Sequence, residues 1–253
     1  MSLLGDLLVP DQAFWLVCGL FYLSDNIRPV KARQIVLVKG ITGAWRPQFP
    51  LHGYRLAGRT VIVLNLVMPH LATVRMDWLT ADSESPRNLR RTRRALGVCA
   101  RRLLHFRVLS AGLFIVFFIA APVATHYVGL GYVLLFVLPL HAMALLLLIG
   151  LLVAGRRSFN LSWQRLSSLA FECAVCPGLF VNIGRRLSLA QARIPGDGMA
   201  FALADGDRGV ATRIGSRLEF LLDDLRENGE MAPEDAPIVE SYRRRLTAVL
   251  EHE

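Results

Sequence analysis

Residues 108–155 form a run of 48 residues that contains no Asp, Glu, Lys or Arg. A membrane-spanning helix needs about 20 residues, and a single helix of this length would measure about 72 Å, over twice the thickness of the hydrocarbon core. We therefore expect this segment to fold back as a transmembrane helical hairpin. Its helices are predicted near 106–124 and 131–154, with a turn at 125–131, where two glycines and a polar cluster occur.

The charges around this run are typical of a chain that crosses a membrane. Residues 1–107 hold 16 basic and 6 acidic groups, whereas residues 156–253 hold 13 and 14. Arginines flank both ends of the predicted hairpin and its turn is uncharged, so the positive-inside rule places both ends in the cytoplasm. Hydrophobic residues make up 53% of the chain, against about 45–50% in soluble proteins, which argues against a freely soluble enzyme. The distribution does not suit a nucleic-acid binder with one basic face.

The N-terminal segment, residues 1–27, is predicted to form a further apolar helix. Ten apolar residues follow one another at 14–23, and a helix extended back to Leu7 reaches Ser24 in 18 residues. Acidic residues precede this run and basic residues follow it, which favours a third span with its N-terminus outside. The alternative is a helix that is buried against the hairpin or lies in the membrane interface.

Residues 28–80 are predicted to form a small β subdomain. Short runs rich in β-branched residues at 34–39, 61–66 and 71–78 are bounded by glycine, asparagine or proline, as strands usually are. They predict an antiparallel sheet of three to five strands. Because so short a segment buries little apolar surface, the sheet is expected to pack on the membrane helices or on a partner.

Residues 81–107 are predicted to be a linker, 81–86, followed by an arginine-rich juxtamembrane helix that runs straight into the first span. At about 1 kcal/mol for each basic residue near an anionic leaflet, this helix could be held on the membrane surface. We favour a topology anchor for these arginines, and the alternative is recognition of a phosphorylated lipid or an acidic partner. The candidate contacts with anionic lipid are Arg87, Arg90, Arg91, Arg94, Arg101 and Arg102.

The C-terminal region, residues 156–253, is predicted to be helical and cytoplasmic. Helices are expected at 160–176, 179–188, 217–228 and 237–252. The first two are separated at Pro177–Gly178, and the last two carry apolar stripes that can close as an antiparallel pair. Glycine, proline and aspartate dominate 195–209, which predicts a loop.

Several residue types that can carry chemistry occur, but each fits a structural role. Cys173 and Cys176 end a helix instead of opening one, so we expect structural free thiols. His126 lies in the predicted turn and His141 about 15 Å into the second helix, so the two cannot share a haem. We expect His141 to bond a carbonyl group that is freed by Pro139.

The aspartates of the C-terminal loop are the last candidates. Asp197, Asp205 and Asp207 do not continue to the glutamate that an EF-hand requires, and turn chemistry explains them better. The sequence therefore predicts no catalytic group, no cofactor and no metal site.

Together these features predict a mainly α protein of the bacterial inner membrane. It has a transmembrane helical hairpin, a third N-terminal helix, and a small antiparallel β-sheet and a helical region that both lie in the cytoplasm. The expected function is that of a non-enzymatic interaction or scaffold component, and the expected partners are the lipid bilayer, a second copy or another membrane protein, and no nucleic acid. The alternative is a membrane enzyme or accessory subunit that acts on lipid headgroups at the arginine-rich face.

Overall fold

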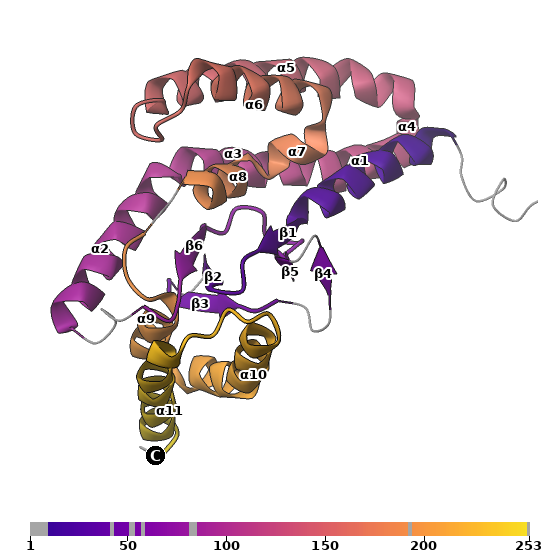
Figure 1. The fold of residues 1–253 in the computed structure, drawn as a ribbon. Coiled ribbons are helices and arrows are strands. Elements are labelled where there is room, and N and C mark those ends of the chain that lie inside the picture. The colour runs from indigo at the N-terminus through magenta and orange to yellow at the C-terminus, as the bar shows by residue number, and fades with distance from the viewer. Residues whose placement is uncertain are drawn as a thin grey trace, which may run out of the picture. The chain divides into compact units, whose positions relative to one another are not determined.

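The computed structural model is mainly helical and describes residues 10–40, 43–50, 54–56, 59–80, 85–191 and 194–251 (Figure 1). It divides into two compact units, each assembled from three segments of the chain. Unit 1 takes its described residues from 1–27, 65–70 and 103–187, and unit 2 from 28–64, 71–102 and 188–253. The predicted linker residues 81–84 lie outside the described residues.

Unit 1 is built around a pair of long helices. α3 (Leu104–Ile115), the π-helical turn η1 (Val116–Ala120) and α4 (Ala121–Val128) form one continuous helix, and α5 (Leu130–Gly155) follows it. These two helices have 25 and 26 residues and are long and apolar enough to span a membrane. Only 28% of the most apolar window of each helix is buried, so neither resembles the core helix of a soluble protein.

The turn between these helices is shorter than predicted. It consists of Gly129, whose φ of +84° lies in the region that favours glycine. Thr125 is still helical and its hydroxyl donates to the carbonyl of Ala121, 2.8 Å away. The fold-back within 108–155 is therefore confirmed, and the turn at 125–131 was predicted too long.

The N-terminal helix α1 (Pro10–Asn26) packs against this pair in unit 1. The indole N–H of Trp15 donates to Thr125 Oγ1 at 2.9 Å, and the ring of Tyr22 lies 4.7 Å from that of Phe118. α1 therefore runs antiparallel to α3 and α4. Its 17 residues measure about 25 Å, and residues 7–9 of the predicted span lie outside the described residues.

Two shorter helices and the start of a third complete unit 1, which ends at Leu187. α6 (Trp163–Val175), α7 (Pro177–Val181) and α8 (Ile183–Gln191) follow α5. The break predicted at Pro177 is confirmed, because α6 ends one residue before Cys176 and α7 starts at the proline. The second predicted helix is divided in two at Asn182.

The described residues of unit 2 form six strands in two three-stranded sheets. One sheet has the order β3 (Trp45–Gln48), β2 (Gln34–Lys39) and β6 (Thr73–Asp77), and β2 is antiparallel to both neighbours. The other has the order β1 (Ile27–Val30), β5 (Arg59–Val63) and β4 (Arg55–Leu56). The strand predicted at 34–39 is confirmed, and those predicted at 61–66 and 71–78 are shifted or shortened.

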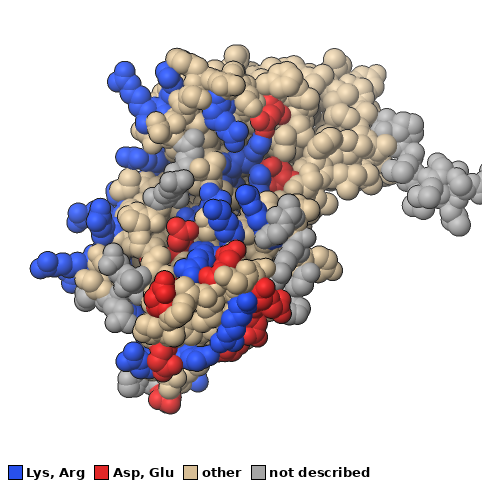
Figure 2. Space-filling view, viewed as in Figure 1, with Lys and Arg blue, Asp and Glu red and all other residues tan. Residues whose placement is uncertain are grey.

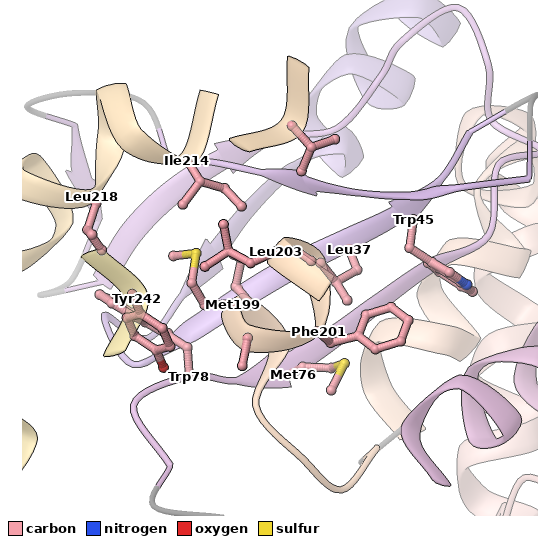
Figure 3. Close-up of a cluster of buried hydrophobic side chains, with 14 of the residues drawn as sticks. Leu37, Trp45, Met76, Trp78, Met199, Phe201, Leu203, Ile214, Leu218 and Tyr242 are labelled. Carbon is pink, nitrogen blue, oxygen red and sulfur yellow. The ribbon is translucent and has the colours of Figure 1, made fainter. Parts of the chain in front are cut away.

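The β3–β2–β6 sheet shares its core with C-terminal helices (Figure 3). The helices α9 (Gly198–Asp205) and α10 (Arg208–Glu227) pack on it, and α11 (Ala236–Glu251) packs on α9 and α10. Gly198 permits a close approach, because a Cβ there would lie 2.5 Å from Ile35 Cγ2. Phe201 and Leu37 are among the fully buried side chains of this core. The sheet thus obtains its hydrophobic cover from within the chain.

The prediction of a loop over 195–209 was wrong. The carboxylate of Asp197 accepts the N–H of Ala200 at 2.8 Å and caps α9, whose apolar residues are buried. Asp207 caps α10 in the same way through the N–H of Val210, so α10 begins nine residues before the helix predicted at 217. Of the three aspartates that were interpreted as turn residues, Asp197 and Asp207 therefore start helices, and Asp205 ends α9.

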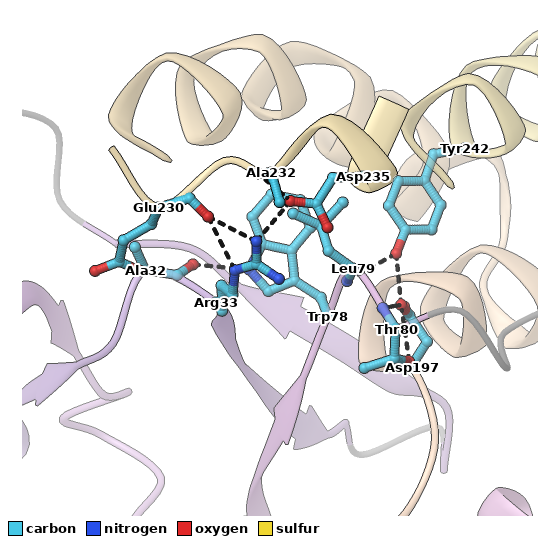
Figure 4. Close-up of polar contacts among 10 residues, drawn as sticks. All are labelled: Ala32, Arg33, Trp78, Leu79, Thr80, Asp197, Glu230, Ala232, Asp235 and Tyr242. Atoms are coloured by element: carbon cyan, nitrogen blue, oxygen red, sulfur yellow. Dashed lines mark hydrogen bonds and ion pairs between the residues drawn. The ribbon is translucent and has the colours of Figure 1, made fainter. Parts of the chain in front are cut away.

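A buried polar network fastens α9 and α11 to the end of β6 (Figure 4). The Tyr242 hydroxyl donates to Asp197 Oδ2 at 2.5 Å and accepts the N–H of Leu79 at 3.0 Å. Thr80 N–H also donates to Asp197, at 3.0 Å. Burial raises the pKa of Asp197, and burial together with that carboxylate raises the pKa of Tyr242. Nearby, Arg33 forms an ion pair with the buried Asp235 at 2.5 Å.

Candidate functional site

The arginine-rich helix α2 (Pro86–Arg102) has one side buried in the core of unit 2. Leu96 and Ala100 are buried there, and Thr92 donates to the carbonyl of Pro195 at 3.0 Å. Burial raises the pKa of the Cys99 thiol, so this cysteine is held in the thiol form. The apolar side of α2 is therefore covered by protein.

The opposite side of α2 carries the six arginines that were predicted to contact anionic lipid. At 3.6 residues per turn they fall within an arc of about 120°, and each of the six is exposed. Figure 2 shows basic side chains projecting along this helix. We call this surface the arginine face; it consists of Arg87, Arg90, Arg91, Arg94, Arg101 and Arg102.

The arginine face is available to an anionic ligand. Within the part of the chain that the structure describes, none of its six guanidinium groups forms an ion pair, whereas Arg93, outside the arc, pairs with Asp205 at 2.6 Å. α2 ends at Arg102 and α3 begins at Leu104, with Leu103 (φ −86°, ψ −1°) between them. The prediction of one uninterrupted helix through residue 107 was therefore wrong, because the helix is interrupted at Leu103.

Unit 1 contains a pocket that the sequence did not reveal. It has a volume of about 540 Å³ and lies between α1, η1, α5, α6 and α7. Its walls are mostly apolar, with Phe21, Phe117 and Phe171 among them, and its polar side chains include His141 and Glu172. The lining residues come from segments more than 100 positions apart, so spacing in the sequence gives no signal for it. We call it the α1–α5–α6 pocket.

His141 bonds a neighbouring helix instead of its own. Its Nε2 lies 3.3 Å from the carbonyl oxygen of Ala174 in α6, and its ring meets those of Phe117 and Phe180 edge-on, with centroids 5.5 Å apart. The predicted bond to a carbonyl freed by Pro139 was therefore wrong. The geometry identifies His141 as a contact between α5 and α6.

A cluster of paired charges in unit 1 was also missed. Arg186 pairs with Glu172 and lies 3.7 Å from Asp25, and the neighbouring Arg185 donates to Asn26 Oδ1 at 2.6 Å. Arg185 is only 2% exposed. In the sequence, the pair of adjacent arginines within the mostly apolar segment 177–189 could have indicated this cluster. We call Asp25, Glu172, Arg185 and Arg186 the α8 charge cluster.

Among the described residues, the cysteines and His126 are not arranged as a catalytic or metal-binding site. All four cysteines are free thiols, including Cys173 and Cys176, for which this was expected, and Cys173 is completely buried. His126 is exposed beside Tyr127, near the turn. Within the described ranges, no three His, Cys, Asp or Glu side chains are placed to hold a metal ion.

Comparisons with family models, with curated proteins and with solved structures find no match for this chain.

Proposed function

We propose that this chain is a multi-pass protein of the bacterial inner membrane. The helices 104–128 and 130–155 cross the bilayer, α1 crosses as a third span, and unit 2 lies in the cytoplasm. The proposal is supported by the absence of charge from residues 108–155 and by the low burial of both long helices, since only 28% of the most apolar window of each is buried. The basic residues on either side of residues 108–155 also support the proposed orientation, because the positive-inside rule assigns such residues to the cytoplasm.

In this proposal the protein is an interaction or scaffold component whose soluble unit is held at the membrane surface. The arginine face is the observation that carries it, because six exposed guanidinium groups share one side of a helix whose other side is covered. At about 1 kcal/mol for each arginine near an anionic leaflet, the face contributes about 6 kcal/mol to membrane attachment. The partner is a second copy or another membrane protein.

Native mass spectrometry of the detergent-solubilised chain tests the lipid contact. Replacing Arg90, Arg91 and Arg94 together by glutamine removes about 3 kcal/mol of attraction, so binding of phosphatidylglycerol is expected to weaken by about 100-fold. The matched control replaces Arg213, Arg217 and Arg244, which are exposed on α10 and α11, by glutamine. Equal lipid binding by both triple variants would contradict the proposal, and so would a monomer that crosslinks to no protein in native membranes.

The alternative function is that of a membrane enzyme or accessory subunit acting on lipid headgroups. It is favoured by the same six arginines, which form no ion pair with any described residue, since a guanidinium group binds phosphate through two parallel hydrogen bonds. The triple variant at Arg90, Arg91 and Arg94 is then expected to lose a lipid-dependent activity while a C-terminal reporter still indicates the cytoplasm. Loss of correct insertion instead would favour the topology anchor.

A further inference from the structure

Residues 156–187 follow the hairpin formed by the helices 104–128 and 130–155. They start at one end of this hairpin and return to the same end. Arg156 directly follows α5, and its guanidinium carbon lies 4.2 Å from the ring centroid of Trp163 at the start of α6. On the return, Gly184 of α8 faces Phe106 near the start of α3, since a Cβ on this glycine would lie 3.7 Å from Phe106. The start of α3 and the end of α5 lie at the same end of the hairpin.

Between these points the segment reaches the middle of α5. Ala174, close to the end of α6, bonds His141, and Phe180 of α7 packs on the same ring. His141 is 11 residues from Leu130 and 14 from Gly155, which corresponds to about 17 and 21 Å. If α5 crosses the bilayer, the turn between α6 and α7 must lie near the middle of the hydrocarbon core.

The exposed side chains of α6 change character along its length. Near its start they are Trp163, 58% exposed, followed by polar side chains that include Gln164, Arg165 and Ser167. Near the turn they are apolar, with Phe171 69% and Val175 68% exposed. Both residues also line the α1–α5–α6 pocket. This change is expected of a helix that starts at the membrane surface and ends among acyl chains.

The backbone at the turn of this segment is bonded or covered by protein, whereas the side-chain oxygen and nitrogen of the buried Asn182 have no hydrogen-bond partner among the described residues. At the turn, the N–H of Cys176 bonds the Glu172 carbonyl at 3.0 Å, the N–H of Leu179 bonds the Cys176 carbonyl at 3.1 Å, and Pro177 has no N–H. α1 covers the turn closely, since a Cβ on Gly178 would lie 2.9 Å from the Cys18 oxygen. Irregular backbone is tolerated at membrane depth where protein covers it.

Of the charged side chains in this segment, Glu172 and Arg186 form an ion pair. The α8 charge cluster holds two arginines and two carboxylates, and Arg186 lies beside both Glu172 and Asp25. Ionisable groups within a membrane pair with one another in this way.

We propose that residues 156–187 form a re-entrant helical hairpin. It enters the hydrocarbon core from the side on which α3 begins, turns at Cys176–Pro177 near the bilayer middle and returns, and the α1–α5–α6 pocket beside its turn is filled by a phospholipid acyl chain. This proposal rests on the membrane placement of α5 under Proposed function.

Photocrosslinking of the full chain tests this proposal in vesicles of phosphatidylethanolamine and phosphatidylglycerol whose acyl chains end in an alkyne. The photoreactive residue p-benzoylphenylalanine replaces Phe171 or Val175 at the turn, Ser167 near the start of α6, or Phe136, which is 77% exposed on α5. Each replaced side chain is exposed, so the folded core is undisturbed. We expect the positions 171 and 175 to label lipid as strongly as 136, and 167 to label it several-fold less.

The control positions separate the two proposals. If 136 labels lipid while 171 and 175 label it as weakly as 167, the re-entrant hairpin is refuted and the spanning helix stands. If 171 and 175 crosslink to protein and not to lipid, this face of α6 binds a partner and the proposal is also refuted. If 136 itself fails to label lipid, the membrane placement fails and the re-entrant hairpin fails with it.

Discussion

Replacing Tyr242 by phenylalanine removes one buried hydroxyl group and leaves the aromatic ring in place. The side chain is completely buried, and its hydroxyl joins α11 to Asp197 before α9 and to the backbone of Leu79 after β6. The variant therefore tests whether this network holds the C-terminal helices on the sheet, without opening a cavity in the core.

The expected loss of stability follows from the two broken hydrogen bonds. The N–H of Leu79 stays buried without its acceptor, which costs about 1–3 kcal/mol, and a hydrogen bond to a charged group contributes about 1.5–3 kcal/mol. Asp197 keeps the N–H groups of Thr80 and Ala200, which offsets part of the second loss, so we expect a net loss of about 2–4 kcal/mol. In a unit of this size that lowers the melting temperature by about 8–16 °C.

Thermal unfolding of the full chain in mild detergent, followed by tryptophan fluorescence, measures this change, because Trp45 and Trp78 lie in the core of unit 2. Tyr54→Phe is the matched control, since Tyr54 is 67% exposed and should melt like the wild type. If Tyr242→Phe melts within about 2 °C of the wild type, the hydroxyl does not support the core and the reasoning is wrong.

Three further changes test other parts of the fold. Phe201→Ala is expected to destabilise unit 2 by about 3–5 kcal/mol in the same melting assay, because the side chain is 1% exposed. Gly178→Ala should lower the melting temperature and the monodisperse yield in size-exclusion chromatography, since its Cβ would meet the α1 backbone at 2.9 Å, whereas Gly112→Ala, with open space around it, should not. Burial raises the pKa of Asp197 above its unfolded value, so its contribution to stability is fully present below the unfolded pKa and is lost as pH rises through the folded pKa. Asp197→Asn cannot ionise and should therefore flatten the decrease in melting temperature with pH across that window; an unchanged slope would contradict the assignment.

Several helices and strands could be located from the sequence, because the pattern that predicts each of them lies within a single segment. The uncharged run predicted two helices, and the β-branched run at 34–39 coincides with β2. Pro177 predicted the break after α6, because proline cannot continue a helix. The start of α9 was missed because the many glycines and aspartates were interpreted as turns, although Asp197 and Asp207 are also good N-cap residues.

The candidate sites divide in the same way. The arginine face could be predicted, because six arginines at helical spacing identify one side of a helix whatever covers the other. The α8 charge cluster could not be predicted, because Asp25 and Arg186 are brought together only by the packing of α1 against α7 and α8. The bond from His141 to Ala174 joins residues 33 positions apart, and no spacing rule covers such a pair.

The amino-acid order alone decided that residues 108–155 double back and that basic groups flank them, because charge and helix length are properties of a single segment. Only the tertiary structure decided that the β3–β2–β6 sheet is covered by α9 and α10, and that the turn after α6 lies beside the middle of α5. Both of these contacts depend on which apolar faces of the helices and the sheet pack against one another. Burial of apolar surface is non-directional, so the choice among possible partners is settled by shape and hydrogen bonding over the whole chain.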